Sequence, residues 1–169
     1  AGSASSNDEQ FNPDDPQLYL QRLRRNVPDV SDLVYMYAAE SVNCYSHETH
    51  IASAVMLGVS SEAAFLEVAR SSITWLGSAG EKLVTALDNP RESYSNKLQV
   101  FRKRIESRKA ELPAELADSM SLTLDSVQDL LRMSRNEAGH PTGKSISRED
   151  QHISLQMFGR YRPLFKKAL

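Results

Sequence analysis

The sequence predicts an all-α protein, a bundle of four to five helices with short accessory helices. Apolar residues recur at every third or fourth position along most of the chain, which is the spacing of one face of an α-helix. No stretch shows the alternating pattern of a β-strand, and proline and glycine, seven of each, stand mainly between the periodic stretches. With 169 residues, of which 40% are hydrophobic and 25% charged, the chain has the size and composition of one globular domain.

The first part of the chain is expected to be unstructured and then helical. Residues 1–12 are mostly small and polar, so we expect a disordered leader or a remnant of expression there, and a single domain over 13–169. A short helix opens the domain and ends before Pro28, because the residue before a proline disfavours helical geometry. The apolar residues of this helix are Leu18, Leu20 and Leu23.

Two long helices follow, and each carries a glutamate on its apolar stripe. A buried carboxylate needs an opposite charge or strong hydrogen bonds, so Glu40 and Glu62 are candidate residues of a polar site. Asp29 is the expected cap of the first long helix, whose stripe holds Leu33, Tyr37, Glu40 and Cys44. The second begins after a polar patch at 46–50 and ends at Gly77, and its stripe holds Ile51, Val55, Gly58, Glu62, Leu66, Ala69 and Ile73.

The middle of the chain is expected to hold shorter elements. Gly77 and Gly80 mark a break before a short helix, and Asn89-Pro90 forms a turn. A basic, loosely patterned stretch follows.

Two helices complete the predicted bundle. The first opens at Pro113 and stops at Gly139, and its stripe holds Leu116, Met120, Leu124, Val127 and Leu131. Ser147 and Asp150 resemble a capping box for the last helix. That helix is expected to kink at Pro163, and its stripe holds Ile153, Met157, Tyr161 and Leu164.

Charge is distributed unevenly along the chain. The net charge of −2 does not suit a protein that binds nucleic acid over its whole surface. No lysine or arginine occurs from Asn26 to Ala69, whereas Arg91 to Lys109 holds seven basic and two acidic residues. Contact between an acidic helix pair and a basic flank would explain this asymmetry, and a nucleic-acid groove is the alternative. Within the basic flank, Arg102, Lys103 and Arg104 are the candidates for guiding RNA, and a solvated helix face is the simpler explanation.

Several classes of site and location are not expected. The only cysteine is Cys44 and no signal peptide opens the sequence, which favours a cytoplasmic protein. No run of about twenty apolar residues is present, so we expect no membrane-spanning segment. His47 and His50 lack the spacing of a zinc-binding H-E-x-x-H helix, and no P-loop or dinucleotide fingerprint occurs, so neither a metal nor a cofactor is expected.

The residues best suited to chemistry are Arg135, Asn136 and His140, at the end of an amphipathic helix. His140 lies four residues after Asn136, about one helical turn along the same side. An imidazole moves protons near neutral pH, a guanidinium holds two phosphate oxygens at once, and an amide orients a substrate or the imidazole. This trio therefore suits phosphodiester chemistry.

The segment from Arg135 to His140, read as R-N-x-x-x-H, resembles the signature of HEPN domains, a superfamily of small helical bundles. Upstream, the stretch from Ala52 to Leu66 resembles the long second helix of many such domains. There a Leu-Gly-x-x-x-Glu pattern matches Leu57, Gly58 and Glu62. The resemblance covers the bundle core from Asp29 to Phe165, apart from the stretch near residues 90–112.

The resemblance implies a metal-independent endoribonuclease that forms a homodimer with its two motifs face to face. His140 would act as general base or acid on the 2′-hydroxyl or the leaving oxygen, and Arg135 would stabilise the pentavalent phosphate. Asn136 would position the motif or the RNA, Glu62 would anchor Arg135, and the product would be a 2′,3′-cyclic phosphate. A role as a toxin or in antiviral defence, with a cognate antitoxin or a longer chain as context, also follows only from the resemblance.

A rival hypothesis is a non-catalytic helical module that binds a nucleotide, a partner or itself, as other members of the family do. Arg135 and Glu62 would then form a structural ion pair. Replacing Arg135 in that case should destabilise the fold by several kcal/mol, on the order of a broken buried ion pair, whereas replacing His140 should be mild.

Overall fold

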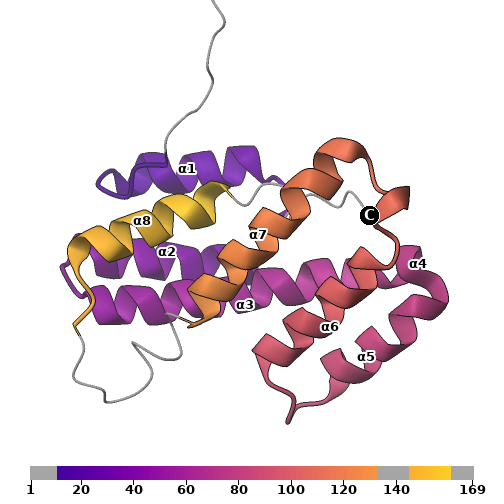
Figure 1. The fold of residues 1–169 in the computed structure, drawn as a ribbon. Helices are drawn as coiled ribbons and strands as arrows, with labels where there is room; N and C mark the ends of the chain where they lie inside the picture. The colour runs from indigo at the N-terminus through magenta and orange to yellow at the C-terminus, as the bar shows by residue number, and fades with distance from the viewer. Residues whose placement is uncertain (1–10, 133–144, 161–169) are drawn as a thin grey trace, which may run out of the picture.

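The computed structural model describes residues 11–132 and 145–160, and this part of the chain is all-helical, as expected (Figure 1). Its elements in chain order are α1 Pro16–Asn26, α2 Asp32–Ser46, α3 His50–Ser71, α4 Ile73–Leu76, η1 Gly77–Gly80, α5 Glu81–Asp88, α6 Tyr94–Glu106, η2 Lys109–Glu111, α7 Ala114–Arg132 and α8 Arg148–Arg160. The predicted breaks before Pro28 and at Gly77 are confirmed, since α1 ends at Asn26 and α4 ends at Leu76. The helix expected to run to Gly77 is divided, however, because α3 ends at Ser71. Gly77 has a φ of 56°, a left-handed conformation that favours glycine.

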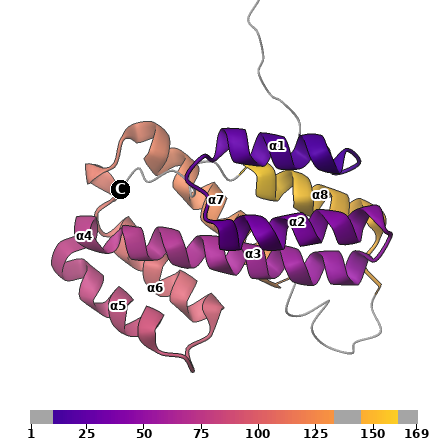
Figure 2. The ribbon, with the colours of Figure 1, turned by 180° about the vertical axis from the view of Figure 1, so that it is seen from behind.

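The centre of the fold is the antiparallel pair of α2 and α3, which is the most extensively packed pair of helices in the described chain. Figures 1 and 2 show α7 and α8 on one side of this pair, α1 beside α2 and α8, and α5 and α6 as a hairpin near the end of α3. The opposite side of the pair faces the viewer in Figure 2, and no other described helix lies in front of it there.

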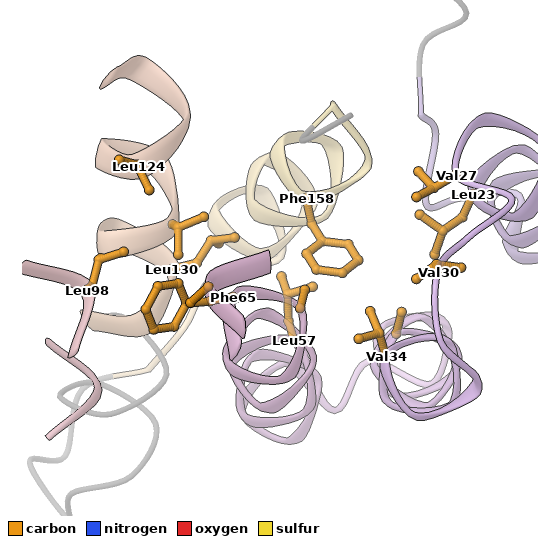
Figure 3. Packing of buried hydrophobic residues seen from close by; sticks show 14 of the residues in the cluster. Leu23, Val27, Val30, Val34, Leu57, Phe65, Leu98, Leu124, Leu130 and Phe158 are labelled. Carbon is orange, nitrogen blue, oxygen red and sulfur yellow. The ribbon is translucent and has the colours of Figure 1, made fainter. Parts of the chain in front are cut away.

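The core joins these helices through large apolar side chains. Figure 3 shows Phe158 of α8 close to Leu57 of α3, and Phe65 of α3 between Leu98 and Leu130. All five side chains are buried. Their removal from water is the main favourable contribution to folding.

A small polar group lies inside this core where α2, α3 and α8 meet. The Ser41 hydroxyl donates to the carbonyl of Ser53 at 2.7 Å, and the Ser53 hydroxyl donates to the carbonyl of Ser41 at 2.8 Å. Gln151 of α8 donates through Nε2 to Oγ of Ser53 at 2.8 Å. Serine is small enough to let the helices approach closely, and these bonds fix the register of α2 against α3.

The helix α3 is long and apolar enough to cross a membrane by length and composition, and 44% of that window is buried inside the structure. Its contacts with α2, α7 and α8 are those of a core helix, which is compatible with a soluble protein.

The predicted faces of three helices are wrong. In α3 the expected Ile51 is 49% exposed and Val55, Glu62 and Leu66 are only partly buried, whereas the buried face holds Leu57, Ala64 and Phe65. In α2 the buried residues are Val34, Ala38, Ser41, Val42 and Tyr45, one position on from the expected stripe. Leu33 is 51% exposed and Glu40 is exposed as well. In α8 the expected Ile153 is 54% exposed, and the buried residues are Gln151, Ser154, Leu155, Phe158 and Gly159. Apolar residues occur on more than one face of these helices, and the helices that pack against them decide which face is buried.

The predicted caps, stripes and kinks of the remaining helices are confirmed in part. Ser31, not Asp29, caps α2, and its Oγ accepts from the Val34 amide at 3.2 Å. The basic, loosely patterned stretch after Asn89 contains α6, and Lys103 is exposed on it, in agreement with a solvated helix face. The expected stripe of α7 is confirmed at its three members whose burial is described, Met120, Leu124 and Val127. The predicted kink at Pro163 lies outside the described residues.

The packed domain begins earlier than expected. Phe11 was assigned to the leader, but it is 3% exposed and its ring meets Tyr19 edge-on, with ring centroids 5.4 Å apart. Residues 1–10 lie outside the described part of the chain.

Candidate functional site

The three motif residues Arg135, Asn136 and His140 lie outside the described residues, so their geometry stays a prediction. The segments on either side of the motif are described. Helix α7 is described as far as Arg132, and the chain is described again from Ser145 into α8. The predicted capping box at the start of α8 is confirmed, because the Asp150 amide donates to Oγ of Ser147 at 3.1 Å and that hydroxyl donates to Oδ2 of Asp150 at 2.8 Å.

The two candidate glutamates differ in their surroundings. Glu62 is partly buried on α3, as a residue of a polar site could be. Glu40 is exposed on α2, so the expectation of a buried carboxylate is wrong there. Its Oε1 lies 3.9 Å from Sγ of Cys44, one turn further along the same helix. Water solvates Glu40, and its charge needs no protein partner.

The three candidate RNA-guiding residues lie on α6 but are not equally available. Arg102 forms an ion pair with Asp125 of α7 at 2.5 Å, and 31% of its side chain is exposed. Lys103 is exposed, and Arg104 is partly buried with no hydrogen-bond partner at Nε. Of the three, Lys103 is the side chain most open to a nucleic acid.

A cluster of polar side chains that the sequence did not reveal surrounds the hydroxyl of Tyr45, at the end of α2. We call Asp14, Tyr45, Arg148 and His152 the Tyr45 cluster. Tyr45 donates to Oδ1 of Asp14 at 3.1 Å, and Nε of Arg148 donates to Tyr45 at 3.2 Å. Arg148 also donates to Oδ1 of Asp14 at 2.7 Å, and Nδ1 of His152 lies 2.9 Å from the tyrosine oxygen.

His152 completes the Tyr45 cluster. Its Nδ1 is within hydrogen-bond distance of the tyrosine oxygen, and which of the two donates depends on the tautomer of the imidazole. The imidazole is partly accessible, since 27% of the His152 side chain is exposed.

The charges of the Tyr45 cluster stabilise one another. The hydrogen bond from Arg148 lowers the pKa of Asp14, and the bond to Asp14 raises the pKa of the Arg148 guanidinium. Burial raises the pKa of the Tyr45 hydroxyl. Asp14 and Arg148 therefore stay charged and Tyr45 stays neutral at neutral pH, and the cluster ties the segment before α1 to the start of α8.

A pocket lies next to this cluster, at the start of α3. It has a volume of about 510 Å³ and is lined by Glu48, Thr49, His50, Ile51, Ala52, Ser145 and Ile146. The ring of His50 packs against Tyr45 with centroids 5.8 Å apart, and its Nδ1 is buried without a hydrogen-bond partner. His47 instead donates through Nδ1 to the carbonyl of Asn43 at 2.9 Å. Within the described ranges, no three His, Cys, Asp or Glu side chains lie close enough together to hold a metal ion.

Sequence reasoning missed the Tyr45 cluster because its members lie far apart in the chain. Asp14 and Arg148 are separated by 134 residues. One local signal was present: Arg148 and His152 are four residues apart, which puts a cation and an imidazole on one face of α8.

Similarity to known proteins gives no further guide to the site. Comparison with family models, with curated proteins and with solved structures finds no match for this chain. The resemblance of the motif to HEPN domains therefore stays a prediction from the sequence, and function is inferred from the chain's own residues.

Proposed function

We propose that this protein is a HEPN-like, metal-independent endoribonuclease whose acting residues are Arg135, Asn136 and His140. The observation that carries the proposal is the sequence R-N-x-x-x-H, which stands between α7 and α8 of an all-helical chain. A fold that packs long amphipathic helices around one core supports it, because such a scaffold can hold a cation and an imidazole in fixed relation.

The proposed reaction needs only protein groups. His140 removes the proton of a ribose 2′-hydroxyl, the 2′-oxygen attacks the adjacent phosphorus, and the bond from phosphorus to the 5′-oxygen breaks. The leaving 5′-oxygen takes up a proton, so the products are a 2′,3′-cyclic phosphate and a 5′-hydroxyl. Arg135 stabilises the extra negative charge of the pentavalent phosphate, and Asn136 positions the motif or the RNA.

The wider setting belongs to the same proposal. RNA is the substrate and Lys103 is the best placed of the basic residues on α6 to attract it. The protein acts in the cytoplasm as a homodimer, as a toxin or in antiviral defence, and a cognate antitoxin or a longer chain supplies its context.

A second candidate function is a non-catalytic module that binds a partner. The observation that favours it is the side of the α2 and α3 pair that no other described helix covers (Figure 2). A helical domain that has lost catalysis could use such a face for docking.

The decisive test is cleavage of mixed cellular RNA by the purified protein in EDTA. Wild type should produce fragments with 2′,3′-cyclic ends, and His140→Ala should produce none while its melting temperature stays close to that of wild type. His47→Ala is the matched control, because His47 is an exposed imidazole bonded to its own helix, and it should cleave like wild type. A folded wild type that leaves RNA intact would overturn the ribonuclease proposal.

A further inference from the structure

The pocket at the start of α3 is formed by two parts of the chain that lie far apart in sequence. Residues 48–52, at the turn into α3 and in its first residues, contribute one part of the wall, and Ser145 and Ile146, just before α8, contribute the other. Figures 1 and 2 show the starts of α3 and α8 at the same end of the bundle. The volume of about 510 Å³ lies within the range of sites that hold small organic molecules.

The wall of this pocket suits an uncharged, flat ligand. Ile51, Ala52 and Ile146 provide apolar surface, and Ile51 is 49% exposed. Among the residues described at the wall, none is a lysine or an arginine. A phosphate group placed here would meet the carboxylate of Glu48 and no basic side chain, so repulsion disfavours it.

The first turn of α3 supplies hydrogen-bond donors at the pocket. The Ser53 amide makes the first hydrogen bond of the helix, to the carbonyl of Thr49 at 3.0 Å. Thr49 does not cap the helix, because its hydroxyl donates instead to the carbonyl of Cys44 at 2.9 Å. The amides of residues 50–52 therefore have no acceptor within the described part of the chain. Free amides at the start of a helix attract a ligand oxygen.

Acceptors lie beside these donors. The chain turns at Glu48, which has a φ of 59°, and α3 begins two residues later. A carboxylate such as that of Glu48 can accept two N–H groups of one ligand at once. His50 adds a third polar group, since its Nδ1 is buried with no hydrogen-bond partner among the described residues, and buried polar atoms are normally paired.

Guanine is the RNA base whose edge matches this arrangement. It presents the acceptor O6 beside two donors, the N1–H and the N2 amino group. O6 can accept from the amides of residues 50–52, and the two donors can bond to the two carboxylate oxygens of Glu48. Adenine and cytosine present an amino group where guanine has O6, so they would set a donor against the amides. Uracil has only one N–H for the carboxylate.

We propose that this pocket binds a guanine base of RNA, with Glu48 and the first amides of α3 as its recognition groups. The consequence rests on the proposed ribonuclease function: the base in the pocket selects where the strand is cleaved. Ser145 follows His140 by five residues, so even an extended chain keeps their Cα atoms within about 18 Å. The bound base and the cleaved bond thus belong to the same short stretch of RNA.

The first experiment titrates the protein with guanosine and follows the amide chemical shifts by NMR. In wild type the amides of residues 50–52 should shift. Glu48→Gln should weaken binding about tenfold to a hundredfold, because its side-chain amide sets a donor against the N2 amino group. Glu81→Gln is the matched control, since Glu81 is also an exposed glutamate at the start of a helix but lies outside the pocket, and it should bind like wild type. No binding by wild type, or undiminished binding by Glu48→Gln, would overturn the proposal.

Inosine tests whether Glu48 recognises the base. It keeps O6 and N1–H but lacks the N2 amino group, so wild type should bind it about tenfold more weakly than guanosine. In Glu48→Gln the two nucleosides should bind about equally, a result that a merely structural role of Glu48 would not produce. Adenosine that binds wild type as tightly as guanosine would show that the pocket does not select a base, and would overturn the proposal.

Cleavage of oligoribonucleotides that contain a single guanosine separates this inference from the proposed function. Wild type should cut next to the guanosine, and His140→Ala should bind guanosine but cut nothing. Guanosine binding by a wild type that cuts no RNA would refute the ribonuclease proposal and support the guanine site. Cleavage without preference for guanosine, together with no shift of the α3 amides, would refute the guanine site and support the ribonuclease proposal.

Discussion

Gly159 of α8 should resist replacement by alanine although alanine favours helices. The Phe11 ring lies where the Cβ of an alanine would stand, so Gly159→Ala must displace the ring. Phe11 is 3% exposed, and exposing a buried side chain of this size costs about 1.5–3 kcal/mol. The higher helix propensity of alanine relative to glycine stabilises the fold by about 1 kcal/mol. We therefore expect Gly159→Ala to lower the free energy of unfolding by about 0.5–2 kcal/mol.

The same substitution should change sign once Phe11 is absent. Phe11→Ala alone should cost about 3 kcal/mol, the lower end for loss of a buried phenylalanine, since the residue precedes the first helix. In the Phe11→Ala background nothing opposes the Cβ at position 159, so Gly159→Ala should stabilise by about 0.5–1 kcal/mol. The two sites are then coupled by about 2 kcal/mol.

Urea denaturation of the four proteins, followed by circular dichroism, measures this coupling. The midpoints should shift while the dependence on urea stays constant, because the surface exposed on unfolding is nearly the same. Effects that add to within about 0.5 kcal/mol would refute the reasoning. They would mean that Phe11 does not pack on α8, and that the leader extends through residue 12 as first expected.

Three further predictions concern the polar and basic side chains. Arg148 lowers the pKa of Asp14, so the Asp14 carboxylate stabilises the fold above about pH 4 and this stability is lost as pH falls through the lowered pKa. Wild type and Asp14→Asn should differ in the free energy of unfolding by under about 1 kcal/mol, because this pair is half exposed. Urea denaturation at a series of pH values should show this difference shrinking below about pH 4. Tyr45→Phe removes a buried hydroxyl with several partners and should lower the free energy of unfolding by about 1–2 kcal/mol in urea, and an unchanged stability would contradict the geometry of the cluster. In salt-dependent RNA binding followed by fluorescence anisotropy, Lys103→Ala should weaken binding more than Arg102→Ala does, and equal affinities of both variants and wild type would exclude α6 as the RNA guide.

The sequence predicted where helices begin and end better than which way they face. Proline and glycine act locally, so the ends at Pro28 and Gly77 could be identified without knowing the fold. The buried face of a helix depends on its neighbours. In α2, Leu33 is exposed although it is apolar, whereas Ser41 is buried because its small side chain admits α3 and its hydroxyl bonds across to Ser53.

The candidate site was predictable to the extent that its chemistry is local in sequence. Arg135 and His140 stand within one short segment, so a motif can identify them. The Tyr45 cluster joins residues from the segment before α1, from α2 and from α8, and no pattern along the chain brings these together. The face of α3 that holds Val55 and Leu66 was predicted to be the core face, because the apolar pattern of one helix does not tell which of its two apolar faces the neighbouring helices cover.

The partial burial of Glu62 lowers the loss of stability that we expect when Arg135 is replaced. From sequence alone, a structural pairing of the two predicted a loss of several kcal/mol, on the order expected when a fully buried carboxylate loses its partner. Glu62 is only partly buried, so water compensates for much of a lost partner, and the cost falls to about 1 kcal/mol. Under the ribonuclease proposal, Arg135→Ala should therefore melt within a few degrees of wild type, as ~1 kcal/mol implies for a domain of this size, while cleavage is lost. Arg135→Lys keeps the charge but not the two-pronged contact with phosphate, and it should recover only part of the cleavage rate. Full activity of Arg135→Ala beside a severe loss of stability would show that Arg135 supports the fold and not the reaction.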